Sequence, residues 1–258
     1  MSCHIISGWG WKQIRNSPAT VRPRTGNLFR SVRGQTAVIL GLGRQGIALA
    51  RYLAERGVHV RASDLRPSHA VGPVLKSLRE YELDFVLGEH PQSLLDGADI
   101  IFVSGGVPTD IPLLQQARER GITLSNDSQL FLEKAPCKVV GITGSAGKTT
   151  VTMLAERIAA ACGRFHQVWA GGNMGNPLLA DVHRMTSQDV AIMELSSFQL
   201  EIMTVSPTVA AILNITPNHL DRHKTMQEYV EVKAHILDRQ RSGDVAVLGW
   251  DDKTVRGL

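Results

Sequence analysis

The stretch from Lys138 to Ala155 reads KVVGITGSAGKTTVTMLA. Its short apolar start, residues 139–142, predicts a buried strand, and the small residues at 144–147 predict a tight loop. Beyond Lys148, apolar residues recur at i, i+3, i+4 and i+7, which predicts a helix with one inward face: Val151, Leu154, Ala155 and Ile158. A strand, a glycine loop and a helix are therefore expected in immediate succession.

This succession is typical of a phosphate-binding loop. The loop N–H groups and the helix N-terminus are expected to face the phosphates of a nucleoside triphosphate. Lys148 is expected to reach the β- and γ-phosphates, and the Thr149 hydroxyl to bind Mg²⁺. The first position of GxxxxGK[ST] falls on Ile142, so the loop is a variant. Its expected ATP-binding residues are Gly144, Ser145, Ala146, Gly147, Lys148, Thr149 and Thr150.

The composition is that of an ordinary globular protein. Of 258 residues, 43% are hydrophobic and 20% are charged. No apolar run approaches the length of a membrane span. The 3 cysteines are scattered and odd in number, which indicates a reducing compartment without a disulfide framework, and we expect a cytoplasmic protein.

The net charge of +4 is concentrated at the N-terminus. Residues 1–33 hold six basic side chains and no acidic one, so the remainder carries +4 − 6 = −2. The basic charge therefore gives no support to nucleic-acid binding. We expect residues 1–33 to be a disordered basic tail; translation from an upstream start and an organelle transit peptide are the alternatives.

A second glycine turn lies upstream. Residues 36–40 predict a strand, the turn GLGRQG occupies 41–46, a helix follows, and a strand at 58–62 leads to Asp64. This spacing is typical of the dinucleotide fingerprint, although the turn suits any diphosphate at a helix N-terminus. Binding of NAD and tight strand–helix packing without a ligand are both open from the residues alone.

Strands and helices alternate along the rest of the chain, which predicts an α/β fold with parallel sheets. Further strands are expected at 84–87, 99–103, 122–124, 189–193, 209–213 and 245–248, and helices at 74–80, 112–120 and 226–239. We expect a Rossmann-like domain over 34–130 and a P-loop domain over 131–258, with residues 125–135 bridging the two. Because the chain ends soon after a strand that no helix covers, we expect the second domain to be truncated.

Three further residues are candidates for metal chemistry. Glu194 closes a predicted strand beside the P-loop, where Mg²⁺ or its water shell is usually held; a merely solvated acid is the alternative. His219 and His223 are four residues apart, but HLDRH lacks the Glu of HExxH, so zinc is not supported. His219 is either a surface loop residue or a ligand of a second divalent ion.

Lys233 lies on the inward stripe of the predicted helix at 226–239. Its apolar neighbours on that stripe are Met226, Val230 and Leu237. The pattern alone favours a lysine that extends its amine to solvent. An enclosed lysine would instead have a lowered pKa and a reactive neutral amine.

Five motifs in this order resemble the Mur ligases: TGSAGKTT, GGNMG, MELSSFQLE, LNITPNHLDRH and YVEVKAHIL. The resemblance covers residues 34–258, and ELSSFQLE favours the branch of the family that adds D-glutamate. It implies that the first domain binds uridine diphosphate and not NAD. The residues implied for this are Leu42, Gly43, Arg44, Gln45, Asp64 and Arg66.

The resemblance also implies a reaction in peptidoglycan synthesis. A monomer would use ATP and two Mg²⁺ ions to join D-glutamate to UDP-N-acetylmuramoyl-L-alanine through an acyl phosphate. Thr149 and Glu194 would hold one ion, and His219 and a carbamylated Lys233 the second. Asn173 and Ser196 would contact the muramoyl-alanine, and the catalytic set would be Lys148, His219 and Lys233.

Two departures from the family accompany this resemblance. Residues 104–106 read Ser-Gly-Gly where the family commonly has Ser-Pro-Gly. The family has a further, C-terminal domain that binds D-glutamate, which we expect to be missing from this chain, so we expect this chain not to complete the reaction alone. The alternatives are a non-catalytic nucleotide-binding fragment and another amino-acid-adding ligase of the same superfamily.

Overall fold

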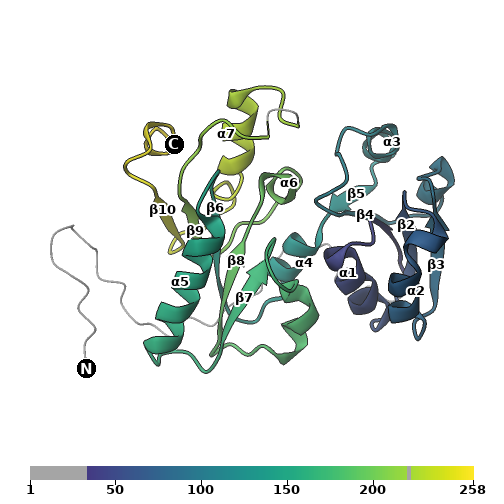
Figure 1. Cartoon of the computed structure of the whole chain (residues 1–258), viewed down its shortest axis with the longest axis horizontal. Helices are drawn as coiled ribbons and strands as arrows, with labels where there is room; N and C mark the ends of the chain where they lie inside the picture. The colour runs from purple at the N-terminus through teal and green to yellow at the C-terminus, as the bar shows by residue number, and fades with distance from the viewer. Residues whose placement is uncertain (1–33, 220–221) are drawn as a thin grey trace.

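The computed structural model describes residues 34–219 and 222–258; the expected basic tail, residues 1–33, lies outside the described residues. Two five-stranded sheets follow one another along the chain (Figure 1). Their strand orders are β3-β2-β1-β4-β5 and β10-β9-β6-β8-β7, and every neighbouring pair is parallel. The expected α/β class is confirmed.

The first sheet and its helices occupy the N-terminal half of the described chain. Its strands are β1 (Thr36–Leu40), β2 (His59–Asp64), β3 (Leu83–Leu87), β4 (Ile100–Val103) and β5 (Thr123–Ser125). Its helices are α1 (Arg44–Ala54), α2 (Gly72–Leu78) and α3 (Pro112–Glu119), with short 3-10 turns η1 (Ser68–Ala70) and η2 (Gln92–Leu95).

The second sheet begins with the P-loop strand. Its strands are β6 (Lys138–Thr143), β7 (Val168–Gly172), β8 (Val190–Glu194), β9 (Val209–Ile212) and β10 (Val245–Leu248). The accompanying helices are α5 (Lys148–Ala161), η3 (Leu178–Arg184), α6 (Ser197–Leu200), α7 (Met226–Ala234) and α8 (Lys253–Arg256), and α4 (Asp127–Lys134) lies between the two halves.

Both faces of each central strand are covered, which explains their nearly continuous apolar sequences. In β1, Ala37 and Ile39 face one core cluster, and Val38 and Leu40 face another. This alternation follows from the two-residue period of a strand. The first of these clusters continues through α4 into the second sheet, so one apolar core joins the two halves.

Several boundaries differ from the sequence expectations. Residues expected to bridge the domains form helix α4, which begins at the side-chain cap of Asn126. Helix α7 ends at Ala234 and not near residue 239, and the short helix α8 follows β10, where none was expected. The division near residue 130 stays a proposal.

The expected inward face of α5 is partly wrong. Val151 and Ala155 pack against the sheet, but Leu154 and Ile158 are 51% and 62% exposed. The inward positions are instead filled by small residues, including Thr152 and Ala159. Small side chains let the helix lie close to the strands. The spacing of large apolar residues alone therefore predicts only part of the inward face.

Candidate functional site

The first glycine turn brings helix α1 close to strand β1. Gly41 has φ +90°, a conformation that favours glycine, and a Cβ at Gly46 would collide with the Gly41 carbonyl oxygen. Gly43 caps the helix without a side-chain hydrogen bond. The first N–H groups of α1 therefore have no side-chain acceptor, as an anion-binding helix end requires.

Asp64, at the end of β2, is bound within the protein. Its carboxylate accepts hydrogen bonds from Leu42 N at 2.7 Å and from Arg66 Nε and Nη2, both at 2.8 Å. Hydrogen bonding to the Arg66 guanidinium holds the pKa of Asp64 well below its usual range. The carboxylate thus fixes the turn, and its oxygens are already occupied by donors, unlike the ribose-binding acid of a dinucleotide fold.

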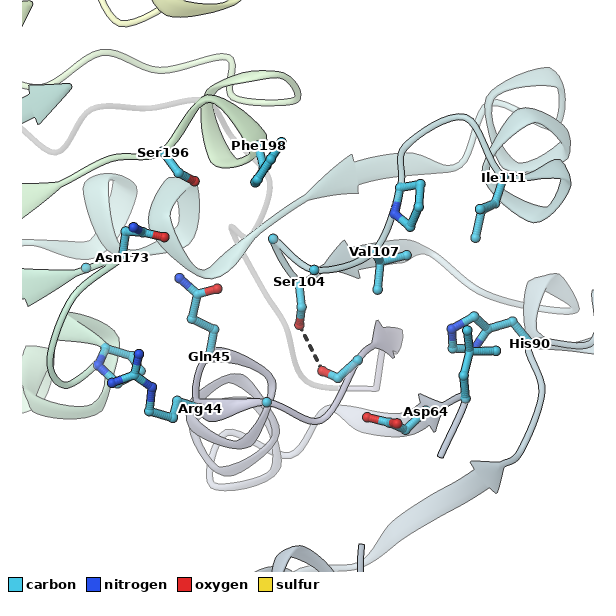
Figure 2. Close-up of a pocket in the computed structure, with 18 of the residues that line it drawn as sticks. Arg44, Gln45, Asp64, His90, Ser104, Val107, Ile111, Asn173, Ser196 and Phe198 are labelled. Carbon is cyan, nitrogen blue, oxygen red and sulfur yellow. Dashed lines mark hydrogen bonds between the residues drawn. The ribbon is translucent and has the colours of Figure 1, made fainter. Parts of the chain in front are cut away.

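A cleft of about 430 Å³ opens between the two halves (Figure 2). Its walls come from the turns after β1, β2, β3 and β4 and from the loops after β7 and β8. Six of the predicted substrate residues line it: Gly43, Arg44, Gln45, Asp64, Asn173 and Ser196. Leu42 and Arg66 do not line it but hold Asp64.

Three hydrogen bonds shape this cleft. Arg44 Nη1 donates to the Gly175 carbonyl at 2.8 Å and so joins the two halves. Ser104 Oγ donates to the Gly41 carbonyl at 2.8 Å, and Val107 N donates to the Ser104 carbonyl at 2.9 Å. The Ser-Gly-Gly loop is therefore anchored by its serine, although it lacks the proline common in the family.

The second glycine turn is built differently. Gly144 and Gly147 have φ +158° and +79°, and Gly147 caps α5 without a side-chain hydrogen bond. Asn214, after β9, supports the loop: its carbonyl accepts from Ser145 N and its Oδ1 from Ala146 N, both at 2.9 Å. Lys148 Nζ turns back to the Gly144 carbonyl at 2.9 Å. Sequence reasoning did not select Asn214, although it lies directly after a strand and within the motif LNITPNHLDRH.

Glu194 connects the P-loop to the cleft. Its Oε2 accepts from Thr149 Oγ1 at 2.7 Å, and its Oε1 accepts from Asn173 Nδ2 at 2.8 Å. Glu194 is 3% exposed, and no basic side chain among residues 34–219 and 222–258 forms an ion pair with it. The buried carboxylate thus has only neutral donors around it.

Lys233 is enclosed, so the solvent-reaching arrangement that its pattern favours is wrong. The residue is 1% exposed, and its Nζ donates to the Gly144 carbonyl at 3.0 Å, the same oxygen that Lys148 binds. Burial, and next the charge of Lys148, lower the pKa of Lys233 to about 7. A large fraction of a neutral, nucleophilic amine is therefore present near neutral pH.

The two histidines of HLDRH differ in environment. His219 is exposed and has φ +53°, and its ring packs edge-on against Phe198, with 5.1 Å between the ring centroids. His223 is buried, and its Nε2 lies 2.9 Å from Ser197 Oγ. Within the described ranges, no three His, Cys, Asp or Glu side chains gather as a metal site.

Ser196 is oriented by residues that the sequence analysis did not select. Gln199 Oε1 accepts from Ser196 N at 2.9 Å, and Ser196 Oγ accepts from Gln199 N at 3.3 Å, which forms a capping box. Asn126, at the start of α4, donates to the Gln199 carbonyl at 2.8 Å. The Ser-x-x-Gln spacing is the signal that could have identified this pair.

Across the described residues, no helix combines the length and apolar character that a bilayer crossing requires. The family description "Mur ligase MurD-like, N-terminal domain" matches residues 35–126, and "Mur ligase middle domain" matches residues 142–258. These two matches correspond to the two sheets and include all the predicted site residues.

Curated relatives show the same similarity. The UDP-N-acetylmuramoylalanine–D-glutamate ligase of Symbiobacterium thermophilum is 42% identical over 224 residues, covering 87% of this chain and 49% of that protein. The enzyme of the same name from Geobacter metallireducens is 40% identical over 228 residues, covering 88% and 50%. The chain thus spans about half the length of the curated relatives it matches.

A solved structure has a similar fold. The UDP-N-acetylmuramate:L-alanyl-gamma-D-glutamyl-meso-diaminopimelate ligase from Neisseria meningitides matches with a TM-score of 0.55 at 17% identity. The match covers 86% of this chain and 74% of that one. At this identity the similarity concerns the fold alone.

Proposed function

We propose that this chain, which belongs to the Mur ligase family, forms the UDP-substrate and ATP sites of a ligase that joins D-glutamate to UDP-N-acetylmuramoyl-L-alanine. The supporting observation is the hydrogen-bonded link from Thr149 through Glu194 to Asn173. It joins a phosphate-binding loop to a cleft between two halves. A reaction between a phosphate of ATP and a group held in that cleft needs such an arrangement.

The uridine diphosphate is assigned to the first half, residues 34–130. Its phosphates would lie at the N-terminus of α1, where Gly43 leaves the N–H groups without a side-chain acceptor. Arg44 and Gln45 line the cleft next to this helix end and point toward the second half (Figure 2). The muramoyl-alanine would then extend toward Asn173 and Ser196.

ATP is assigned to the second half, residues 131–258. The uncapped start of α5 would receive its phosphates, and Lys148 would exchange its contact with the Gly144 carbonyl for phosphate oxygens. This exchange stabilises negative charge as it moves during phosphoryl transfer. A D-glutamate site is not assigned to this chain.

The oxygen ligands near the P-loop fit Mg²⁺. Thr149 and Glu194 provide a hydroxyl and a carboxylate already 2.7 Å apart, and hard divalent cations prefer oxygen ligands, with phosphates completing the shell. When bound, Mg²⁺ would neutralise phosphate charge. Residues His219 and Lys233 are proposed for a second ion, with Lys233 in its carbamylated form.

The enclosure of Lys233 supports the proposed carbamylation. A neutral amine nitrogen can attack CO₂ and lose a proton, which converts an inward cation into an anionic oxygen ligand. This change would also remove the repulsion between Lys233 and Lys148, which bind the same carbonyl. The amine must be neutral to react, so we expect the modified fraction to rise with pH through about 7.

The carbamate can be tested by its carbonyl signal in NMR spectra recorded with ¹³C-bicarbonate. We expect the signal in the unmodified sequence and not in Lys233→Met, with Lys138→Met, at an exposed lysine, as the control. Stability provides a second measurement. The pKa of Lys233 in the folded chain lies below its unfolded value of about 10.4. An unmodified Lys233 therefore lowers the free energy of unfolding by its full amount below pH 7, and this loss disappears as pH rises from about 7 toward 10.4.

In the proposed reaction, the alanyl carboxylate attacks the γ-phosphate of ATP, ADP leaves and an acyl phosphate forms. The amine of D-glutamate then attacks the acyl carbon, and phosphate leaves as the amide bond forms. The chain's residues would contribute mainly by alignment and charge stabilisation. We place this activity in the synthesis of peptidoglycan precursors in the cytoplasm, carried out by a monomer.

The decisive experiment measures phosphate release with ATP, Mg²⁺, UDP-N-acetylmuramoyl-L-alanine and each of several amino acids. It uses both this chain and the longest product of its coding sequence. We expect release that depends on D-glutamate from the longer product and none from this chain alone. Preference for another amino acid would favour a different ligase of the family, and ATP binding without release in both would favour a non-catalytic nucleotide-binding protein.

A further inference from the structure

The end of the cleft remote from Asn173 and Ser196 has a distinct chemical character (Figure 2). Its lining is largely apolar and comes from the loops after β2 and β4: Leu65, Val107, Pro108 and Ile111. His90, on the loop after β3, lies there beside Asp64. Apolar walls with one polar group suit a flat heteroaromatic ring that needs orientation.

The strand order leads a nucleotide from the helix end to His90. Strands β1, β2 and β3 are adjacent and parallel, so the loops after them follow one another along one edge of the sheet. Two strand spacings amount to about 10 Å, a span that one nucleoside covers. With phosphates at the α1 N-terminus, the base would reach His90.

Hydrogen bonding assigns the proton on the His90 ring. Ser63 Oγ lies 3.0 Å from the Glu89 carbonyl oxygen and 2.7 Å from His90 Nδ1. A hydroxyl has one hydrogen and a carbonyl can only accept, so Ser63 donates to Glu89 and His90 Nδ1–H donates to Ser63. Burial lowers the pKa of His90 despite the nearby Asp64 carboxylate, which favours the neutral ring. Its Nε2 is then an acceptor.

Asp64 does not compete for this role. Its two oxygens already accept from Leu42 N and from the guanidinium of Arg66. For His90 Nε2, by contrast, no hydrogen-bond partner is found in the described part of the chain. The apolar end of the cleft therefore has one unused acceptor with a fixed position.

We propose that His90 determines base specificity by accepting, at Nε2, a hydrogen bond from the N3–H of the uracil ring. This inference rests on the proposed function, which assigns UDP to the cleft. Uracil carries a donor at N3, whereas cytosine carries a lone pair there. A lone pair facing Nε2 leaves both acceptors unpaired, so the site disfavours cytidine nucleotides.

The test compares the binding of UDP and CDP to the whole chain by isothermal titration calorimetry. We expect the unmodified sequence to prefer UDP by about tenfold, as expected for one hydrogen bond and an unpaired acceptor. His90→Leu should reduce the preference to within about twofold by weakening UDP binding. His90→Gln, whose amide oxygen can replace Nε2, should keep part of it, and His69→Leu, an exposed histidine outside the cleft, should keep all of it.

Two outcomes would overturn the inference. If His90→Leu melts like the unmodified chain and still prefers UDP, His90 has no role in specificity, whereas the assignment of UDP to the cleft stands. If the unmodified chain binds no UDP, the proposed function itself fails and the inference fails with it. Should His90→Leu not fold, ¹⁵N NMR of the imidazole decides: Nδ1–H with an Nε2 shift caused by UDP supports the role, and Nε2–H excludes it.

Discussion

Asp64 and Glu194 occupy equivalent places in the two halves of the molecule. Each ends a strand of a parallel sheet beside the glycine turn of that sheet, and each is buried. Their partners differ. Asp64 is paired with the guanidinium of Arg66, whereas Glu194 accepts from the hydroxyl of Thr149 and the amide of Asn173.

This difference determines which acid can take a divalent cation. A guanidinium neutralises Asp64 and lowers its pKa, so the carboxylate stabilises a turn and has little remaining attraction for a metal. Neutral donors leave the charge of Glu194 uncompensated, and a cation can replace the hydroxyl hydrogen bond. The same residue type at the same place in a fold thus serves structure in one half and, as we propose, metal binding in the other.

The largest effect is expected at Lys148. In the longest product of the coding sequence, Lys148→Ala should lower phosphate release by roughly 10²–10³-fold, because it removes the charge that faces the transferred phosphate. Lys138→Ala, which changes an exposed lysine on the same strand–turn–helix unit, serves as the control. Unchanged turnover in Lys148→Ala would mean that the second glycine turn does not bind the reacting phosphates.

Glu194→Gln should lower the affinity for the Mg²⁺ ion that accompanies ATP by about 10–100-fold. Glutamine keeps the shape and one acceptor for Thr149 or Asn173 but removes the charge. Titration of ATP binding with Mg²⁺ measures the effect. The same titration of Asp64→Asn should resemble that of the unmodified chain; equal losses in both variants would contradict the comparison.

Asp64→Asn should instead destabilise the fold by roughly 1.5–3 kcal/mol, the value of hydrogen bonds to a charged group. Because the folded pKa of Asp64 lies below the unfolded value of about 3.9, its contribution is complete above that pH and is lost as pH falls toward the folded value. Chemical unfolding at pH 7 and pH 3 checks both points. The difference between variant and unmodified chain should be smaller at pH 3.

The smallest effect is expected on helix α5. Leu154→Ala should change the free energy of unfolding by less than about 0.5 kcal/mol because Leu154 is exposed. The matched change Leu49→Ala on α1, at a side chain 1% exposed, should cost about 2–5 kcal/mol. A large loss from Leu154→Ala would show that this face is covered in solution.

Most of the fold could be predicted because parallel strands buried on both faces have short apolar sequences with glycine turns after them. Helix α4 could not, because it is buried on all sides: Leu130, Phe131 and Leu132 join the apolar core, and Asn126, Ser128 and Gln129 bind partners from the second half. A helix that buries polar and apolar side chains all around lacks the one-sided apolar period from which helices are predicted. The inward face of α5 differs from the prediction because small residues, and not the large apolar Leu154 and Ile158, pack against the sheet.

The candidate site likewise has features that could be predicted from the sequence and features that could not. Sequence alone determined the two strand–turn–helix units and the glycines they require, and it selected Lys148, Thr149 and Glu194 as candidate site residues, because these depend on residues adjacent in the chain or at strand ends. Only the tertiary structure decided that Lys233 is enclosed, that Asp64 is paired with Arg66 while Glu194 has no such partner among the described residues, and that His90 lines the cleft with its Nδ1 beside Ser63. Burial and charge compensation arise between segments distant in sequence, and no local pattern records them.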